Sequence, residues 1–376
     1  MEKPHGAIVK KLTIVVSDVD KAIAFEWMAL HLRFTYDINF LFFGKKEAHL
    51  VRFLRGQQIP HLVVGYSGPF AVLRSFIKTI IVLRREKPHI VHTHLWRATL
   101  LGIPAAWFLR VPKRVITRHH AMVHYREFPS GRKWDRLTQR LATNIVAISE
   151  NTQNILIRRD RANPAKVTLI HHGFDLSQFE EVTADRIADL RARYQTGASF
   201  PVIGVVARYL EWKGIEFVIQ AFSRLRGDYP TAKLLLANAK GSYATQLKTF
   251  LQRLPVDSYF EIEFEQDIPA LYHSMDVYVH VPIDPESEAF GQTYVESLAA
   301  GVPSVFTLSG VAPEFVRNEY NALVVPFRDA EAIHLAIKKL LKDQELRERL
   351  ISNGRKSASL FLLERMIGQL KELYGS

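Results

Sequence analysis

Two carboxylates eight positions apart, Glu288 and Glu296, are the residues of this chain best suited to chemistry; they lie in the stretch SEAFGQTYVESLAAGVPSV. Residues 292–300 predict a helix that Gly301 ends, so Glu296 lies inside the helix and Glu288 in the loop before it. Carboxylates accept strong hydrogen bonds from sugar hydroxyls, and a helix start at Gly291 favours an anion. The pattern fits a phosphorylated sugar, and a capped packing helix with two solvated acids is the alternative.

Alternating strands and helices must position these carboxylates. Short apolar runs predict strands at residues 11–17, 89–95, 113–119 and 144–149, and later at residues 201–209, 232–239, 276–282 and 303–308. Apolar residues at helical spacing predict helices over 69–87, 214–225 and 243–254. This order predicts two doubly wound α/β domains, which bind ligands at the carboxyl ends of their strands and in the crevice between the domains.

The length of the chain also favours two domains, because 376 residues exceed what one hydrophobic core usually serves. We expect a first domain over residues 1–180 and a second over 181–360. A polar linker is expected within 176–200, and a C-terminal helix over 361–376 is expected to pack back on the first domain.

Composition excludes several classes of protein. The chain has no cysteine, which excludes a disulfide framework and cysteine-based metal sites. It has no run of eighteen apolar residues that would cross a bilayer, and its first residues do not read as an export signal. We therefore expect a cytoplasmic protein.

Positive charge is concentrated in the first half. Residues 1–180 hold 28 Lys and Arg against 13 Asp and Glu, whereas the rest holds 22 against 25. A balance of +15 against −3 indicates that the first half meets an anionic partner, such as a lipid surface, a phosphorylated substrate or a nucleic acid. No nucleic-acid-binding module accompanies the charge, so we expect no nucleic-acid partner.

Two basic segments carry much of this charge. Segment 110–140 interleaves cations with aromatic residues, and segment 69–87 places apolar and basic residues on different sides of a helix. The apolar side of segment 69–87 comprises Phe70, Leu73, Phe76, Ile77, Ile80 and Ile81. For 69–87 we expect a helix that packs this side into the core and leaves its cations in solvent. Peripheral attachment to an anionic membrane, or capture of a lipid-diphosphate acceptor, is the functional alternative for the basic half.

Several motifs together carry a resemblance to a known family. SEAFGQTYVESLAAGVPSV resembles the E-x7-E motif of the retaining glycosyltransferases of family 4, which have the GT-B fold of two facing Rossmann-like domains with an interdomain cleft. VARYLEWKGIEFVIQAF, AISENTQNIL and LIHHGFDLSQF are similar to further segments of that family. The order and spacing agree over about residues 85–330. The resemblance implies an acceptor-side first domain and a second domain that binds the nucleotide sugar.

The resemblance also implies roles for individual residues. Arg208 and Lys213 would grip the diphosphate of the donor, which suits two cations at a strand end and a helix start. Glu296 would bind the ribose hydroxyls and Glu288 a hydroxyl of the transferred sugar. The backbone amides near that sugar and the leaving phosphate would come from Phe290, Gly291, Gln292 and Thr293.

A histidine of the first domain is expected to touch the donor sugar. VITRHHAM resembles the threonine-x-histidine of the family, which places the role on His119, with His120 as the less favoured neighbour. His92, His94, His171 and His172 also lie near strand ends, where a hydrogen-bonded structural role is the expectation for each.

The chain departs from the family in two places. The loop at residues 17–21 lacks the Gly-Gly pair that usually follows the first strand, and His172 stands where asparagine usually precedes Gly173. The first departure leaves the acceptor-side contacts open. The same loop contains Asp18 and Asp20, which we interpret as loop and helix-start residues rather than metal ligands.

These observations predict a retaining, metal-independent hexosyltransferase. It would move a sugar from a UDP- or GDP-sugar to a hydroxyl acceptor, such as a lipid-linked or polysaccharide intermediate of cell-envelope glycan synthesis. We expect no cofactor, and a location in the cytoplasm or at the inner face of the membrane. A phosphorylase-like or non-catalytic GT-B protein that binds nucleotide or sugar phosphate remains the alternative.

Overall fold

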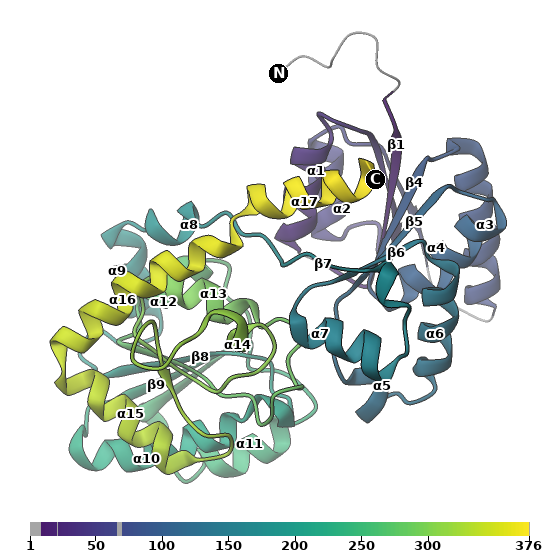
Figure 1. Ribbon diagram of the computed structural model, residues 1–376. Helices are drawn as coiled ribbons and strands as arrows, with labels where there is room; N and C mark the ends of the chain where they lie inside the picture. Colours follow the sequence, from purple (N-terminus) through teal and green to yellow (C-terminus); the bar gives the residue numbers. More distant parts are fainter. Residues whose placement is uncertain (1–8, 21, 66–69, 376) are drawn as a thin grey trace. The chain divides into compact units, whose positions relative to one another are not determined.

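The computed structural model describes residues 9–20, 22–65 and 70–375. The chain divides into two compact units, each with its own parallel sheet (Figure 1). Unit 1 comprises Met1–Phe174 with Leu363–Ser376, and unit 2 comprises Asp175–Leu362. The start of the chain, the last residue of the loop at 17–21 and the first residue of the predicted helix 69–87 lie outside the described residues.

Unit 1 is built on a parallel sheet in the order β3-β2-β1-β4-β5-β6-β7. Its strands are β1 (Lys11–Ser17), β2 (Asp37–Phe43), β3 (His61–Val64), β4 (Ile90–His94), β5 (Lys113–Arg118), β6 (Asn144–Ala147) and β7 (Val167–Leu169). The four strands expected from the sequence are confirmed within two residues at each end. The chain order reverses between β1 and β4, which is the place where doubly wound sheets bind ligands.

Helices cover both faces of this sheet (Figure 1). They are α1 (Ile23–Leu32), α2 (His49–Gly56), α3 (Ala71–Glu86), α4 (Trp96–Phe108), α5 (Val123–Arg126), α6 (Gly131–Leu141), α7 (Glu150–Asn154) and the C-terminal α17 (Leu363–Gly375), with a π-turn at Ile155–Arg159 and a 3-10 turn at Pro164–Lys166. Helix α17 shares a core with α1, α2 and β1, into which it places Met366, Leu370 and Tyr374.

Helix α3 only partly follows the expectation that its large apolar side enters the core, because of that side only Phe76 and Ile80 pack against the core, as half-buried side chains. The buried side of the helix carries Ala71, Ser75 and Thr79, followed by Val82 and Leu83. Small residues spaced by four let α3 lie close to α4. The other large apolar side chains that were expected inside, Phe70, Leu73, Ile77 and Ile81, are exposed instead.

Unit 2 repeats the arrangement with a parallel sheet in the order β10-β9-β8-β11-β12-β13. Its strands are β8 (Val202–Val206), β9 (Lys233–Ala237), β10 (Tyr259–Ile262), β11 (Val277–His280), β12 (Ser304–Phe306) and β13 (Leu323–Val324). Strands β8, β9 and β11 are buried throughout, which explains their continuous apolar runs. The order reverses between β8 and β11.

The helices of unit 2 include two in the segment where a polar linker was expected. They are α8 (Ser177–Glu180), α9 (Ala184–Arg193), α10 (Ile215–Asp228), α11 (Ala244–Leu251), α12 (Ile268–His273), α13 (Gln292–Ala299), α14 (Ala312–Phe315), α15 (Ala330–Lys342) and α16 (Gln344–Ala358), with 3-10 turns at Glu211–Lys213, Val256–Ser258 and Ser359–Phe361. Helix α9 begins at the cap residue Thr183, whose side chain accepts from Arg186 N. The boundary between the units lies at Phe174 and Asp175, just before 176–200, so this segment belongs to unit 2 and is not the expected linker.

Within the described ranges, none of the helices combines the length and apolar character that a membrane crossing requires.

Candidate active site

Three loops of unit 2 meet at the carboxyl ends of β8, β11 and β12. The backbone N–H of Ile283 donates to Trp212 O at 3.1 Å, which joins the loop after β11 to the loop after β8. Gly214 allows this approach, because a Cβ there would lie 2.2 Å from Val281 O. On the other side, a Cβ on Gly310 would lie 2.7 Å from the Cβ of Glu288. The site is thus built at the switch point of the sheet.

Glu288 lies in the middle of these loops and is 5% exposed. Its Oε1 forms an ion pair with Lys213 and lies 3.0 Å from His280 Nε2. Its backbone N–H donates to Ser309 Oγ at 3.1 Å. Burial alone would raise the pKa of this carboxyl, but the charge of Lys213 and the bond from His280 outweigh it and lower the pKa to about 2. Glu288 is therefore ionised at neutral pH.

His280 contacts Glu288 in this candidate site, and the sequence motifs did not indicate it. It ends β11 and is almost fully buried, with its ring edge-on to Tyr294 at 4.7 Å. Burial lowers the pKa of His280, so the ring is neutral and donates through Nε2 to the carboxylate. The available signal was a histidine at the end of an apolar strand, eight positions before Glu288.

Glu296 lies on α13 in a different environment from Glu288. Its Oε2 accepts a hydrogen bond from Tyr272 Oη at 3.0 Å. Desolvation by the surrounding protein raises the pKa of Glu296 to about 7, and the single bond from tyrosine only partly offsets it. The two acids of one motif therefore have opposite shifts, and Glu296 titrates near neutrality.

The start of α13 presents backbone amides beside Glu288. Gly291 precedes the helix with φ 86°, and no side chain in the described part of the chain caps the first turn. Phe290 is buried and its carbonyl accepts from Val311 N at 2.9 Å, which fixes the turn. Gln292 is exposed and Thr293 is half-buried. The helix start can therefore receive an anion.

The two cations expected to hold a diphosphate occupy different settings. Arg208 follows β8 and is exposed. Lys213 is half-buried in the 3-10 turn before α10, where it pairs with Glu288 and lies 4.5 Å from the ring centre of Trp212. The structure thus joins Lys213 directly to Glu288 and leaves Arg208 facing solvent.

In unit 1, His119 belongs to a cluster of histidines at the carboxyl ends of β4 and β5. His119 Nε2 lies 3.0 Å from His94 Nδ1, and its ring stacks on His172 at 5.4 Å. Burial, aided by the neighbouring rings, lowers the pKa of all three, to about 4 for His172. These rings, with His171, line a small cavity of about 30 Å³. At neutral pH they offer uncharged donors and acceptors to a ligand.

His92 belongs to the same cluster but has the structural role expected of it. Its Nδ1 is bonded to Tyr374 Oη at 2.6 Å and its Nε2 to Thr117 Oγ1 at 2.7 Å. Both ring nitrogens are therefore used inside the core, and burial lowers the pKa of His92 to about 3.

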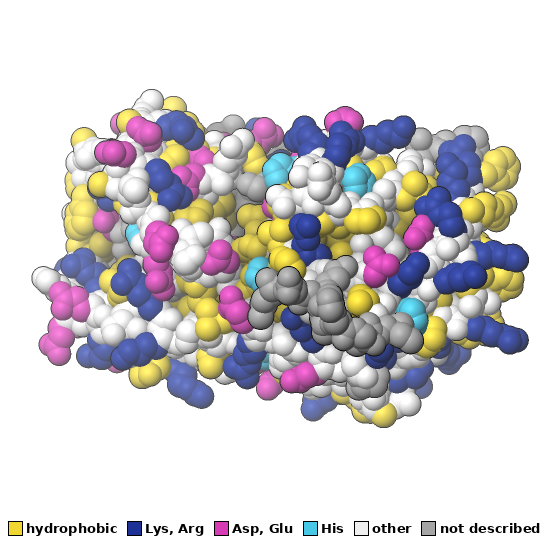
Figure 2. All heavy atoms as spheres, turned by 90° about the horizontal axis from the view of Figure 1, so that it is seen from above, with side chains coloured by type: hydrophobic (Ala, Val, Ile, Leu, Met, Phe, Trp, Pro, Cys, Tyr) yellow, Lys and Arg dark blue, Asp and Glu magenta, His cyan; other side chains and the backbone are white. Residues whose placement is uncertain are grey.

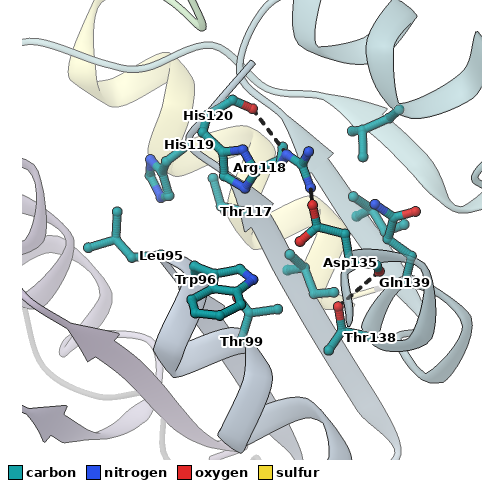
Figure 3. A pocket seen from close by; sticks show the side chains of 13 residues that line it. Leu95, Trp96, Thr99, Thr117, Arg118, His119, His120, Asp135, Thr138 and Gln139 are labelled. Atoms are coloured by element: carbon teal, nitrogen blue, oxygen red, sulfur yellow. Dashed lines mark hydrogen bonds and ion pairs between the residues drawn. The ribbon is translucent and has the colours of Figure 1, made fainter. Parts of the chain in front are cut away.

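His120, the neighbour of His119, points toward a buried ion-pair network instead (Figure 3). Arg118 donates to Asp135 at 2.7 Å and to the carbonyl of His120 at 3.0 Å. His124 lies 2.6 Å from the same carboxylate oxygen of Asp135. These histidines and Asp135 are close enough to share a metal ion, but the guanidinium already supplies the positive charge there. We interpret the network as the link between β5 and α6.

The glycine-free loop after β1 is held by its aspartates. Asp18 adopts φ 57°, a left-handed conformation that aspartate tolerates better than most residues, and pairs with Arg97 at 2.6 Å. Asp20 accepts from His49 N at 2.9 Å at the start of α2. Both acids thus have the loop and helix-start roles expected from the sequence.

Comparisons with known proteins agree with this architecture. The family models "Glycosyl transferases group 1" and "Glycosyltransferase Family 4" match residues 187–357 and 35–178. The capsular polysaccharide biosynthesis glycosyltransferase CapM of Staphylococcus aureus is 30% identical over 299 residues, covering 76% of each chain. A D-inositol 3-phosphate glycosyltransferase of Salinispora arenicola is 25% identical over 308 residues, covering 76% of this chain and 68% of the relative.

Solved structures show the same fold. The Anabaena protein Alr3699/HepE, crystallised in complex with UDP, has a TM-score of 0.81 at 20% identity. The match covers 97% of this chain and 99% of the Anabaena chain. A glycosyltransferase from Rickettsia africae has a TM-score of 0.80 at 19% identity, with coverage of 97% and 98%.

Proposed function

The chain belongs to the family 4 glycosyltransferases of GT-B fold, and from this membership we propose a specific reaction for it. A sugar moves from a nucleoside-diphosphate donor to a hydroxyl of the acceptor, with retention of configuration at the anomeric carbon. The observation that carries the proposal is Glu288, which is held ionised by Lys213 and His280 beside the uncapped start of α13.

In this proposal the charges of unit 2 serve the donor. Lys213 and Arg208 neutralise the diphosphate, and the amides at Gly291, Gln292 and Thr293 bind the sugar and the leaving phosphate. Glu288 accepts a hydrogen bond from a sugar hydroxyl. Lys213 lies between two anions in the complex, which limits the repulsion that Glu288 would otherwise exert on the phosphates.

The chemical step is a displacement at the anomeric carbon. The bond between that carbon and the phosphate oxygen breaks, a bond to the acceptor oxygen forms on the same face, and the acceptor proton passes to the leaving phosphate. Positioning and electrostatic stabilisation of the leaving group supply the rate. We propose that lysine, arginine and helix amides carry the positive charge that other transferases obtain from a divalent metal.

We further propose that UDP is the nucleotide and that the acceptor is a lipid-linked or polysaccharide intermediate of the cell envelope. UDP is suggested by the complex of the Anabaena protein, and the acceptor class by relatives named for capsular polysaccharide and lipopolysaccharide core synthesis. The protein would act at the inner face of the membrane, which suits its basic first half.

Thermal-shift measurements against a panel of nucleoside diphosphates test the proposal. UDP should stabilise the protein more than GDP or ADP, because a ligand that binds only the folded state raises the midpoint. Arg208→Ala and Lys213→Ala should each weaken UDP binding about tenfold or more, the cost of losing a charged hydrogen bond. Lys248→Ala, which removes an exposed cation from α11, is the matched control.

Equal stabilisation by all nucleotides would contradict the choice of UDP, and unchanged affinity in both cation variants would contradict the assigned diphosphate site. Turnover of a UDP-sugar with inorganic phosphate as the only acceptor would favour a phosphorylase instead.

A further inference from the structure

Helix α3 exposes the side chains that a water-soluble helix normally buries. Leu73 is 57% exposed, Ile77 48% and Ile81 60%, and Phe70 just before the helix is 80% exposed. Leu73, Ile77 and Ile81 are spaced by four and form one stripe along the helix. The opposite side, with Ala71, Ser75 and Thr79, is the one that is buried.

This inversion leaves a stripe of large aliphatic side chains in water. Burying a leucine or isoleucine side chain contributes about 1.5 to 3 kcal/mol in the core of a protein. Phe76 and Ile80 of the same helix pack against the core, whereas Leu73, Ile77 and Ile81 lie in solvent and forgo that contribution. Contiguous apolar surface of this kind indicates a partner or a membrane.

The charge beside the stripe identifies the partner. Arg74 and Lys78 each follow a residue of the stripe by one position, and Arg84 and Arg85 follow at the C-terminal end. The one acidic residue of the helix is its last, Glu86, which forms an ion pair with Arg85 at 2.8 Å, so the helix remains strongly basic. In Figure 2, hydrophobic and basic side chains lie next to one another along the right edge, on the side where α3 lies in Figure 1.

We propose that α3 is an interfacial helix that lies flat on an anionic lipid surface. Its 16 residues extend about 24 Å along the membrane plane. The aliphatic stripe enters the boundary between headgroups and acyl chains, while the lysine and arginine side chains remain at the level of the phosphates. A second copy of this chain fits the surface less well, because its own row of cations would meet the same row here.

The inference deepens the proposed function, since a membrane-bound acceptor gives the enzyme a reason to bind lipid, but it can be tested without any transfer reaction. The chain has no cysteine, so Ile77→Cys carries a single environment-sensitive fluorophore. Its emission should shift to the blue and rise with vesicles of phosphatidylcholine and phosphatidylglycerol. The same label on Val256→Cys, at a site of unit 2 that is 86% exposed, should not respond.

Two sets of substitutions separate the apolar from the electrostatic contribution. Replacing Leu73, Ile77 and Ile81 by glutamine should lower partitioning into these vesicles about tenfold or more. Replacing Arg74, Lys78 and Arg85 by glutamine should lower it by about tenfold and remove most of its salt dependence. Glutamine keeps the helix propensity in both sets.

Two matched controls remove the same number and kind of side chains at sites outside α3. Replacing Val256, Leu335 and Leu360 by glutamine removes three exposed apolar side chains of unit 2. Replacing Arg136, Arg140 and Arg161 by glutamine removes three cations of unit 1 that lie outside α3. Both controls should bind vesicles within about twofold of the wild type, because interfacial binding depends on the area and charge of the contacting helix.

The inference is overturned if the wild type does not bind these vesicles. It is also overturned if both sets of glutamine substitutions in α3 leave the affinity for the vesicles unchanged. It is also overturned if sedimentation shows a dimer that the apolar set dissociates, because a second copy then covers the stripe. Stabilisation by UDP, measured on the same preparations, separates the two proposals. UDP binding without vesicle binding rejects the lipid surface alone, and the reverse rejects the proposed donor site alone.

Discussion

The carboxyl ends of the two sheets both hold buried titratable side chains, but the candidate site of unit 2 contains a charged one and the histidine cluster of unit 1 does not. Beside the ends of β8 and β11 a buried carboxylate is charged, because the ion pair with Lys213 holds Glu288 in its anionic form. At the ends of β4 and β5 the histidines are neutral, because burial lowers the pKa of His94 and His119. The comparison teaches that burial does not decide a charge state by itself. A carboxylate with a cation in contact stays ionised, whereas buried imidazoles that face one another stay neutral.

Replacement of Glu288 by glutamine is the strongest way to break the comparison. The variant keeps the size of the side chain and removes the negative charge that Lys213 and His280 stabilise. Transfer should fall about a thousandfold or more, as expected for loss of a group that contacts the reacting sugar. UDP affinity should be retained or increased, because an anion near the diphosphate is gone.

Steady-state transfer rates and UDP titrations check this expectation, with Glu263→Gln as a control on an exposed carboxylate of the same unit. A Glu288→Gln variant with wild-type transfer rates would refute the role of the carboxylate.

The pH dependence of nucleotide binding sharpens the comparison between the two glutamates. Glu296 has its pKa raised from 4.5 to about 7, and only the ionised form can accept both ribose hydroxyls. UDP affinity should therefore fall about tenfold from pH 8 to pH 6, as the ionised fraction falls. In Glu296→Gln, affinity should be lower at pH 8 and nearly independent of pH.

The same shift affects the stability of the unliganded protein in the opposite direction. The folded state binds the proton of Glu296 more tightly than the unfolded state between pH 4.5 and about 7, so this contribution to stability decreases as pH rises through that window. Denaturation of wild type and Glu296→Gln at pH 5 and pH 8 checks the sign. An equal pH slope in both proteins would contradict it.

The effect expected to be smallest at neutral pH comes from one ring of the neutral cluster. The pKa of His172 is lowered from 6.5 to about 4, so the unfolded chain takes up a proton first as pH falls below 6.5. Unit 1 therefore loses stability between pH 6.5 and about 4. Replacing His172 by asparagine should recover about 2 kcal/mol at pH 5 and little at pH 7.5.

Chemical denaturation followed by circular dichroism at the two pH values measures this difference. His61→Asn, a histidine of β3 outside the cluster, is the control. A gain of the same size at both pH values would show that packing, rather than protonation, is responsible.

Much of this architecture could be predicted from local pattern. The strands over 11–17, 201–209 and 232–239 stand out because buried parallel strands are continuous apolar runs. Strands β2, β3, β7, β10 and β13 were not predicted; β7 and β13 have only three and two residues, which give no periodicity. The glutamate motif located α13 and its glycine correctly, since a helix start depends on adjacent residues.

The buried face of α3 and the role of His280 could not be found in this way. Segment 69–87 has one side of large apolar residues and one side of small residues, and either side could be buried as judged from the sequence. The structure buries the small-residue side, where α3 contacts α4. His280 becomes informative only when the loop after β11 brings Glu288 to its ring.

The sequence alone therefore determined the two α/β halves, the loop-and-helix placement of the paired glutamates and the basic character of the first half. Only the tertiary structure decided which of these groups are charged. Lys213 is 75 positions from the carboxylate that it holds ionised, and Tyr374 is 282 positions from the ring of His92. Desolvation and ion pairing act over a few ångströms in space, so protonation depends on neighbours that the order of residues does not reveal.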